Sequence, residues 1–341
     1  MPAPREAEVV RDADLSRLST FRLPARAAEL VVIEHPDQLA GLAPPASDEL
    51  VLGGGSNTVF IGDFPGRVVL DRMRGLRFEE TGDTVRVSAA AGENWHRLVR
   101  ECLRRGLHGI ENLAMIPGSV GAAPMQNIGA YGIELAECFE FLQALDRRSG
   151  EMVRLEREDC GFGYRDSRFK SADRGRFLIT EVSLGLSRNF RPQTGYASLS
   201  EELARVGAVD PTPRQLTAAI MRLRRHRLPD PGRLANSGSF FKNPVLAASD
   251  AEALLAEYPA LPHWPMPDGR AKLAAAWMIE RLGWKGRSLG DAGVYRNHAL
   301  VLVNHGRATA ADLLRLIEAI TDSVERHFGI RLEPEPMLVG R

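Results

Sequence analysis

The stretch Glu49-Leu50-Val51-Leu52-Gly53-Gly54-Gly55-Ser56-Asn57-Thr58-Val59-Phe60-Ile61 decides the fold of this chain. Its apolar start and its β-branched and aromatic end both favour strands, which predicts a strand, a glycine loop and a second strand. The dinucleotide fingerprint Gly-x-Gly-x-x-Gly would require glycine where Thr58 stands, followed by a helix. The Gly-Lys-Ser/Thr signature of a nucleotide P-loop is also absent. The stretch therefore excludes both common helix-based phosphate sites.

The loop can still hold an anion. The successive backbone N–H groups of Gly53, Gly54 and Gly55 can form an anion-binding nest, and Ser56 and Asn57 add side-chain donors. An isolated glycine triplet is more often a plain tight turn, so a phosphate site here needs support from other motifs.

Length and composition set wide bounds. The chain has 341 residues, enough for two or three domains, and its 44% hydrophobic and 26% charged residues are typical of a globular protein. Lys plus Arg equal Asp plus Glu at 44 each, which argues against a bulk polyanion such as DNA as partner. A local basic pocket remains compatible with this balance.

Cysteine usage and hydropathy predict a cytoplasmic protein. The three cysteines, Cys102, Cys138 and Cys160, are isolated, as expected for reduced thiols rather than a disulfide framework or a metal site. Residues 1–18 lack the continuous hydrophobic core of a signal peptide. No apolar run reaches the ~20 residues that a membrane span needs.

The remaining elements follow an α+β pattern without internal repeats. We expect helices at 93–105, 212–227, 271–282 and 309–328, with Gly106 and Gly329 as C-terminal stops. We expect strands at residues 68–70, 85–88, 139–145, 152–155, 177–186 and 299–303.

Residues 112–133 contain no charged side chain but several glycines and prolines, so neither a long helix nor a membrane span is expected there. One interpretation is a buried irregular connector. The interpretation we favour is uncharged backbone that wraps a large ligand at close range, because a ligand can satisfy the polar groups of a buried loop.

The order of several motifs resembles one enzyme family. The glycine loop is followed by Ile116-Pro117-Gly118-Ser119-Val120-Gly121, Gln126-Asn127-Ile128-Gly129-Ala130-Tyr131-Gly132, Gly163-Tyr164-Arg165-Asp166-Ser167, Leu228-Pro229-Asp230-Pro231, Gly238-Ser239-Phe240-Phe241-Lys242-Asn243-Pro244 and Leu332-Glu333-Pro334-Glu335. This order is similar to that of the UDP-N-acetylenolpyruvoylglucosamine reductases of type I, and the resemblance covers nearly the whole chain.

The resemblance implies an α+β fold with an FAD-binding domain of the vanillyl-alcohol-oxidase (PCMH) type in two subdomains, plus a smaller α/β substrate-binding domain. The first subdomain is expected at 1–71 together with 329–341, the second at 72–228, and the substrate-binding domain at 229–328. Noncovalent FAD, NADPH as reductant and UDP-N-acetylglucosamine enolpyruvate as substrate are implied, in the synthesis of peptidoglycan precursors. We expect a monomer without nucleic-acid or membrane partners.

Three residues are implied to be catalytic. By resemblance, Arg165 and Glu335 stabilise the negative charge that hydride addition creates on the enolpyruvyl carboxylate, and Ser239 protonates the neighbouring carbon. Arginine suits a carboxylate because its planar fork offers paired charge-assisted bonds. Glu335 would have to carry or share a proton, and Ser239 would need a nearby cation, Lys242 or Arg227. Without the resemblance, Arg165 would be assigned to an ion pair, Glu335 to solvent, and Ser239 to a turn or helix cap.

The resemblance also implies binding residues. FAD is expected at Gly53, Gly54, Gly55, Ser56, Asn57, Pro117, Gly118, Ser119, Gly121 and Gly129. The substrate is expected at Tyr164, Tyr196, Arg227, Lys242, Asn243 and His298. The basic helix end at Arg224 and Arg227 is expected to face phosphates. The sequence departs from the family pattern at Ala122, Ala123, Arg227, His298, Pro336 and Met337, which puts the contacts at these positions in doubt.

Two other functions stay open at this point. A flavin oxidase that uses oxygen often tethers its flavin to a histidine, but residues 53–60 and 112–133 contain none, and the nearest is His108. A flavin-free UDP-sugar binding protein would not need Arg165, Ser239 and Glu335 together. The colour of the purified protein and its oxidation of NADPH would distinguish the reductase, the oxidase and the binding protein.

Overall fold

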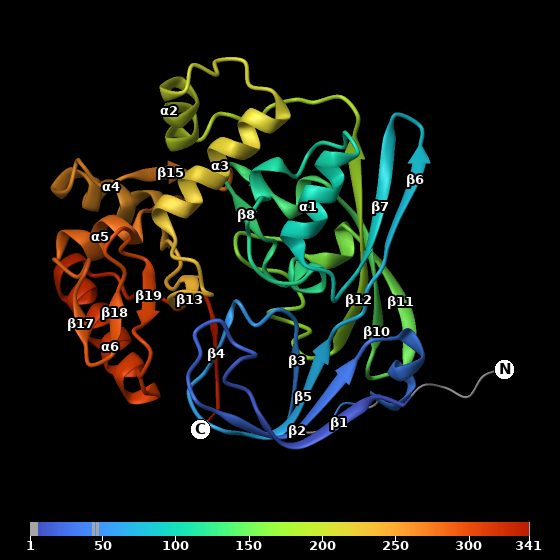
Figure 1. Ribbon diagram of the computed structural model, residues 1–341. Coiled ribbons are helices and arrows are strands. Elements are labelled where there is room, and N and C mark those ends of the chain that lie inside the picture. The colour runs from blue at the N-terminus through green and yellow to red at the C-terminus, as the bar shows by residue number, and fades with distance from the viewer. Residues whose placement is uncertain (1–5, 43–44, 46–47, 341) are drawn as a thin grey trace. The chain divides into compact units, whose positions relative to one another are not determined.

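The computed structural model describes residues 6–42, 45 and 48–340 (Figure 1). The first five residues of the segment expected to lack a signal peptide lie outside this part. The chain divides into two units: unit 1 comprises residues 1–13, 27–54 and 65–224, and unit 2 comprises 14–26, 55–64 and 225–341. The glycine loop belongs to both, because Gly54 is the last residue of one segment of unit 1 and Gly55 begins a segment of unit 2.

The first sheet of unit 1 has the strand order β1-β2-β5-β3. Strands β3 and β5 pair in parallel, with Leu50 opposite Val68. Its buried side chains share a core with Leu145 and Leu178 of the second sheet. Its elements are β1 (Glu8–Asp14), β2 (Arg26–Ile33), β3 (Glu49–Leu52), β5 (Phe64–Asp71) and the 3₁₀ helix η1 (Pro36–Leu42).

The second sheet of unit 1 is antiparallel, with the order β11-β10-β12-β7-β6. Its central strands contribute to the largest core of the unit, together with Trp95, Leu98 and Leu216 from helices. The strands are β6 (Leu76–Thr81), β7 (Thr84–Ala90), β10 (Phe139–Asp146), β11 (Glu151–Glu156) and β12 (Phe177–Ser187). The helices are α1 (Trp95–Arg104), α2 (Ala197–Arg205) and α3 (Pro213–Arg227), the last of which ends in unit 2.

Helix α1 forms where its sequence predicts. The Asn94 side chain accepts a hydrogen bond from the N–H of Arg97, which satisfies a donor of the first turn. Trp95, Leu98, Val99 and Cys102 lie on one buried face at helical spacing.

The uncharged tract is irregular, as expected. It contains only short 3₁₀ turns and a pair of two-residue strands. Most of its backbone is therefore not engaged in sheet hydrogen bonds, as expected for a loop that wraps a ligand. The short elements of unit 1 are η2 (Glu111–Leu113), η3 (Val120–Ala122), η4 (Pro124–Gln126), β8 (Gly129–Ala130), β9 (Ile133–Glu134), η5 (Leu135–Glu137) and η6 (Glu158–Cys160).

Unit 2 is built on a sheet of order β13-β19-β18-β17, on β14-β16-β15, and on the parallel pair β20-β4. Its core joins Phe240 and Phe241 to Met278, Leu316 and Phe328. The strands are β4 (Thr58–Phe60), β13 (Ala235–Ser239), β14 (Val245–Leu246), β15 (His263–Pro265), β16 (Ala271–Leu273), β17 (Ser288–Leu289), β18 (Ala292–Val294), β19 (Val301–Asn304) and β20 (Met337–Val339). The helices are α4 (Ala248–Glu257), α5 (Ala275–Arg281) and α6 (Ala310–Phe328).

Two predicted elements begin later than expected. The helix predicted at 271–282 starts at Ala275, because residues 271–273 pair as β16 with β14 and β15. The strand predicted at 299–303 starts at Val301, because the Val301 N–H closes a turn onto the His298 carbonyl. In the first case sheet pairing overrides the helical pattern, and in the second a local turn delays the strand.

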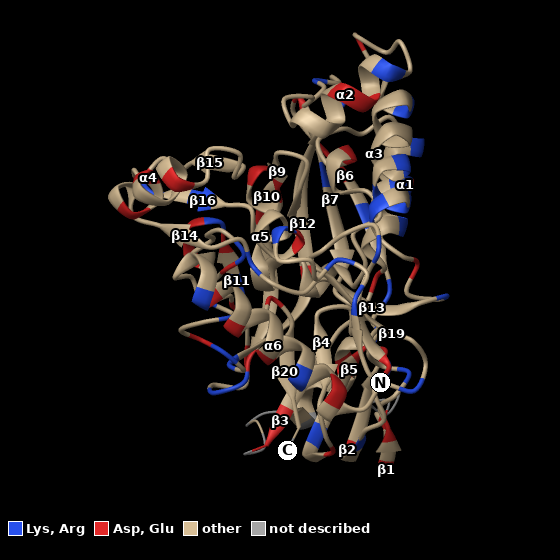
Figure 2. Ribbon diagram, turned by 90° about the vertical axis from the view of Figure 1, so that its left-hand side faces the viewer, with Lys and Arg blue, Asp and Glu red and all other residues tan. Residues whose placement is uncertain are grey.

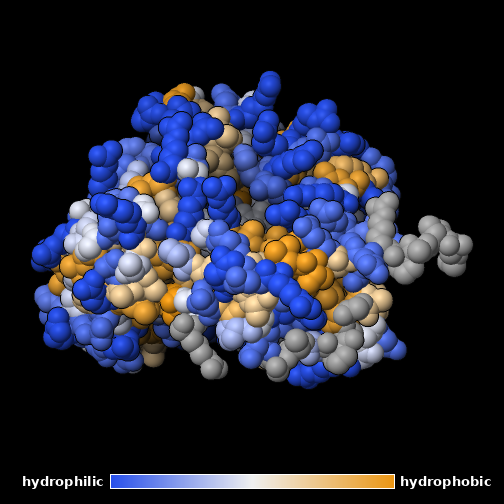
Figure 3. All heavy atoms as spheres, turned by 60° about the horizontal axis from the view of Figure 1, so that its bottom comes forward, coloured by the Kyte–Doolittle hydropathy of each residue, from blue (hydrophilic) through white to orange (hydrophobic). Residues whose placement is uncertain are grey.

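The α+β fold is confirmed, whereas the three-part domain division stays a prediction. Among the described residues, no helix is long and apolar enough to cross a membrane. Lys, Arg, Asp and Glu are interspersed along the ribbon (Figure 2), and the face shown in Figure 3 has groups of hydrophobic side chains between hydrophilic ones.

Candidate active site

The glycine loop packs against the second motif in unit 1. A Cβ added to Gly54 would lie 2.7 Å from the Gly118 Cα atom, and one added to Gly53 would lie 2.2 Å from the Ser119 Oγ atom. Neither position has room for a side chain. The two loops predicted to hold FAD phosphates are therefore in direct backbone contact.

Gly55 needs its glycine for a different reason. Its φ is +60°, a left-handed conformation, and a Cβ would lie 1.7 Å from the Leu18 carbonyl oxygen within unit 2. Its own carbonyl accepts a hydrogen bond from Thr20 N–H at 3.1 Å. The chain turns sharply here. The backbone N–H groups of the loop remain the predicted hydrogen-bond donors to a phosphate.

The second motif is fixed to the start of α1. The Trp95 N–H donates to the Gly118 carbonyl at 3.1 Å, and the Val120 N–H donates to the Glu93 carbonyl at 2.8 Å. Gly121 lies against Ala91, where a Cβ would come within 2.5 Å of the Ala91 Cβ. These bonds hold the backbone of residues 118–121 in one conformation before any ligand binds.

The third and fourth motifs also lie together in unit 1. Asn127, with a left-handed φ of 43°, donates to Glu134 Oε2 at 2.7 Å and to the Gly163 carbonyl at 3.2 Å. The Ser167 hydroxyl donates to the Met125 carbonyl at 2.7 Å. These contacts position the turn that carries Tyr164 and Arg165.

Arg165 is held next to Gly129. Its Nη2 group donates to the Gly129 carbonyl at 2.9 Å, and its guanidinium lies 5.9 Å from the ring centroid of Tyr164. Its φ of 53° is unusual for a residue with a side chain and marks a constrained turn. The structure thus brings together three predicted site residues, Gly129, Tyr164 and Arg165.

Arg224 is a half-buried cation that interacts electrostatically with Arg165. Its Nε atom is inaccessible and has no hydrogen-bond partner among the described residues. Burial, and after it the charge of Arg165, lowers the pKa of Arg224, whereas Tyr131 acts in the opposite direction. Two neighbouring arginines in a partly buried place are unfavourable unless an anion binds between them.

Tyr196 is placed near the same group. Its ring packs edge-on against Tyr131 at 5.5 Å, and the Tyr131 carbonyl accepts a hydrogen bond from Asn112 at 2.8 Å. Tyr196 is 37% exposed, so its hydroxyl-bearing ring is available to a ligand. The predicted substrate tyrosine therefore lies near Tyr131, which is itself adjacent to Arg224.

Unit 2 brings together Ser239, Glu335 and Asn57. Ser239 ends β13 and is paired with Val301, which excludes the turn and helix-cap roles considered for it. The Glu335 N–H donates to the carbonyl of Phe240, the next residue, at 2.8 Å. The Asn57 side chain donates to the Glu335 carbonyl at 3.4 Å. One predicted FAD residue and two predicted catalytic residues thus share one strand neighbourhood.

Lys242 and Asn243 have structural contacts as well. The Lys242 Nζ atom lies 2.8 Å from Glu333 Oε2, and its backbone N–H donates to the Glu333 carbonyl. The Asn243 Oδ1 atom accepts the N–H of Ala275, the first residue of α5. The amide nitrogen of Asn243 is the part of that side chain left for a substrate.

His298 is a neutral hydrogen-bonding group at neutral pH. Its Nδ1 atom accepts the Leu300 N–H at 3.2 Å, so Nε2 carries the ring proton. Burial lowers its pKa to about 4, with Arg227 and Lys285 acting in the same direction. His298 can therefore donate a hydrogen bond through Nε2.

The other departures have local explanations. Ala122 and Ala123 continue a 3₁₀ turn through hydrogen bonds to the carbonyls of Ser119 and Val120. Met337 pairs with Thr58 and donates its N–H to the Asn57 carbonyl. These contacts use backbone atoms alone, so they do not depend on which side chains stand at these three positions.

Other chemistry-bearing groups are occupied. Cys102, Cys138 and Cys160 are free and buried, and burial raises the pKa of each thiol to about 12, which keeps them unreactive. His108 lies 2.7 Å from Glu111 and packs on Phe190. No group of three or more His, Cys, Asp or Glu among the described residues could hold a metal ion.

Sequence reasoning missed Tyr131 as a candidate contact and the burial of Arg224. Tyr131 was visible only as part of a motif, although its place in the uncharged tract was a usable signal. An arginine in the last turn of a helix is usually solvated, so no sequence feature separates Arg224 from its basic neighbours.

The cradle of glycines and the adjacent cations fit a phosphate-bearing cofactor, and comparisons with known proteins agree. Residues 31–156 match the FAD binding domain family. A solvent-stable cholesterol oxidase shares the fold, with 13% identity over 96% of this chain and 87% of its own and a TM-score of 0.50. The protein is therefore a flavoprotein with an FAD-binding fold of the vanillyl-alcohol-oxidase (PCMH) type.

The particular family follows from the second half and from the whole chain. Residues 230–339 match the C-terminal domain of UDP-N-acetylenolpyruvoylglucosamine reductase. The reductase of Azoarcus sp. strain BH72 is 49% identical, over 97% of this chain and 98% of that protein. The reductase of Burkholderia multivorans is 47% identical, over 99% of both. The chain belongs to the UDP-N-acetylenolpyruvoylglucosamine reductase family and is a flavin-dependent oxidoreductase.

A solved relative agrees in fold. The reductase from Thermus caldophilus is 27% identical, covers 97% of this chain and 98% of its own, and has a TM-score of 0.66. The resemblance inferred from the motifs is thus confirmed at the level of family, fold and FAD binding.

Proposed function

We propose that the chain reduces UDP-N-acetylglucosamine enolpyruvate to UDP-N-acetylmuramate with NADPH as reductant, in the synthesis of peptidoglycan precursors. The names of its relatives support the substrate, and the half-buried arginines Arg165 and Arg224 support the chemistry. We expect it to act as a monomer in the cytoplasm.

The observation that carries this proposal is the proximity of Arg224 to Arg165. A buried guanidinium with an unsatisfied Nε, beside a second guanidinium, makes a strong site for an anionic group. The carboxylate of an enolpyruvyl ether and the phosphates of a UDP-sugar are such groups.

FAD, when bound, would supply the redox chemistry, the transfer of a hydride from NADPH to the methylene carbon of the enolpyruvyl group. The residues of this chain handle the charge and the proton. Arg165 is proposed to pair with the substrate carboxylate as negative charge develops on it, and Glu335 to share a proton with the same carboxylate.

Ser239 is proposed to donate a proton to the carbon next to the carboxylate. A serine hydroxyl is a weak acid, so a cation must stabilise the alkoxide that remains. Lys242, three residues along the chain, and Arg227 are the proposed cations. The ion pair between Lys242 and Glu333 would keep the lysine charged and oriented.

The proposed FAD contacts are Gly53, Gly54, Gly55, Ser56, Asn57, Pro117, Gly118, Ser119, Gly121 and Gly129. The close packing of Gly53 and Gly54 against Gly118 and Ser119 supports a site made largely of backbone. The proposed substrate contacts are Tyr164, Tyr196, Arg227, Lys242, Asn243 and His298.

The test is a substrate-dependent assay on the purified protein. We expect a yellow protein whose FAD is released on denaturation, and NADPH oxidation that requires the enolpyruvyl UDP-sugar and yields a product two mass units heavier. NADPH oxidation at the same rate with oxygen alone would favour an oxidase. A colourless protein that binds UDP-sugar would favour a binding protein.

A further inference from the structure

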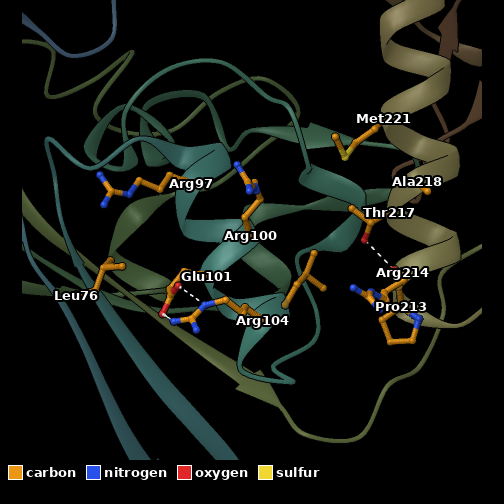
Figure 4. Close-up of a pocket in the computed structure, with 11 residues that line it drawn as sticks. Leu76, Arg97, Arg100, Glu101, Arg104, Pro213, Arg214, Thr217, Ala218 and Met221 are labelled. Atoms are coloured by element: carbon orange, nitrogen blue, oxygen red, sulfur yellow. Dashed lines mark hydrogen bonds and ion pairs between the residues drawn. The ribbon is translucent and has the colours of Figure 1, made fainter.

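A basic groove of unit 1 shares no residue with the site described above. It lies between α1 and the first half of α3 and has a cavity volume of about 860 Å³ (Figure 4). Its walls are formed by Leu76, Arg97, Arg100, Glu101, Leu103, Arg104, Pro213, Arg214, Thr217, Ala218 and Met221. We refer to this set as the α1–α3 groove.

The groove is strongly cationic. Four arginines line it against one glutamate. Glu101 is already paired: Arg104 and Arg105 donate to it at 2.7 to 3.0 Å, and these bonds lower its pKa to about 2. The guanidinium groups of Arg97, Arg100 and Arg214 make no hydrogen bond or ion pair within the described part of the chain. Three cations of the groove are therefore uncompensated by protein.

The cations are arranged along and across the groove. Arg97, Arg100 and Arg104 lie at spacings of three and four residues, hence on one face of α1 and over about 10 Å of helix. Arg214 and Thr217 lie on α3, whereas the side chains of Arg97 and Arg104 extend to the side of α1 that is turned away from α3 (Figure 4).

Apolar side chains complete the walls. Leu76 and Leu103 lie on the α1 side, and Pro213, Ala218 and Met221 on the α3 side. The volume is within the roughly 300–1,000 Å³ of small-molecule sites, which combine apolar walls with a few polar anchors. Arginine forks bind phosphate oxygens in pairs, and the apolar walls offer a surface for a planar ring.

We propose that the α1–α3 groove binds a nucleoside polyphosphate, with the phosphates on Arg100 and Arg214 and the base against Leu103 and Met221. The site is separate from the residues assigned to FAD and to the UDP-sugar. Its occupant therefore binds together with the substrate rather than in competition with it.

Titration calorimetry of the FAD-loaded protein with ATP tests this proposal. We expect saturable binding of ATP and weaker binding of inorganic tripolyphosphate. The double variant R100Q/R214Q should bind ATP at least about tenfold more weakly. R326Q removes an exposed cation of α6 and should bind ATP as the wild type does.

A second variant, M221S, separates the contribution of the base from that of the phosphates. It should weaken the binding of ATP and leave the binding of tripolyphosphate unchanged. Circular dichroism and FAD content equal to wild type show that each variant is folded. The proposal is overturned if ATP gives no saturable heat, if R100Q/R214Q binds ATP as tightly as wild type does, or if tripolyphosphate binds as tightly as ATP.

Discussion

Glu335 donates its backbone N–H to the carbonyl oxygen of Phe240 at 2.8 Å, so the glutamate is tied to the residue that follows Ser239. Both segments belong to unit 2, and their backbone is further fixed by the pairing of Ser239 with Val301. A proton donor and a carboxylate partner that act on neighbouring atoms of one substrate need such a common frame.

Replacing Arg165 should damage one half of the reaction. Arg165→Gln removes the fork proposed to bind the substrate carboxylate, and we expect kcat/KM for the enolpyruvyl UDP-sugar to fall by about 10²–10³, with partial recovery in Arg165→Lys. Reduction of the bound FAD by NADPH should stay within about threefold of wild type.

FAD content distinguishes this role from a structural one, because Arg165 also donates to Gly129. A variant that loses its FAD, or that slows both half-reactions alike, would show that Arg165 acts by holding the loop.

Gly54→Ala should weaken FAD binding. The added Cβ would meet backbone atoms of Gly118 at 2.7 Å, and the two loops would have to separate. We expect most of the flavin to be lost on purification. The measurement is the ratio of visible flavin absorbance to ultraviolet protein absorbance. Gly195→Ala is the matched control, because a Cβ there meets nothing within 4 Å. Equal flavin content in the two variants would contradict the predicted contact.

Asp71 should make stability depend on pH. Burial raises the pKa of Asp71 from 3.8 to about 7, although the Met73 N–H and Arg74 oppose the change. The folded state then binds more protons than the unfolded state, so this contribution is present below pH 3.8 and is lost as pH rises through 7.

Asp71→Asn should therefore stabilise the protein at pH 8, by about 1–2 kcal/mol, and give little gain at pH 4. Urea unfolding of both proteins at each pH measures the difference. The comparison must be made with wild type at the same pH, because His298, with its pKa lowered to about 4, favours folding as pH rises. A gain independent of pH would contradict the buried protonated carboxyl.

Removing one partner of the Arg147–Glu49 ion pair should destabilise the protein more than removing both. Both side chains are 1% exposed, and Arg147 also donates to the Leu42 carbonyl at 3.2 Å. Arg147→Leu leaves a buried carboxylate and should lower the free energy of unfolding by about 3–5 kcal/mol. The double variant with Glu49→Leu should recover at least about 1 kcal/mol of this loss, measured by urea unfolding. Additive losses would mean that the two charges do not interact.

Much of the fold could be predicted from local signals. The Gly329 stop and the strand in place of a helix after the glycine loop, at Thr58, each depend on neighbouring residues, and the structure confirms them. The late start of α5 could not be predicted, because residues 271–273 pair in a sheet with residues 6 to 27 positions away in the sequence.

The part of the site that consists of sequence motifs could be predicted. The contact of the glycine loop with Gly118, and that of Arg165 with Gly129, join motifs that the sequence had already singled out. The burial of Arg224 and the role of Asn243 as an acceptor for α5 depend on distant packing, which the local sequence does not encode.

The most direct test of the proposed reaction is rapid-mixing measurement of both half-reactions in Ser239→Ala. We predict that NADPH reduces the bound FAD at a rate within about threefold of wild type, whereas reoxidation by the enolpyruvyl UDP-sugar slows by about 10²–10⁴, the usual contribution of a positioned proton donor. Equal slowing of both half-reactions, or reoxidation at the wild-type rate, would contradict the role of Ser239 as the proton donor.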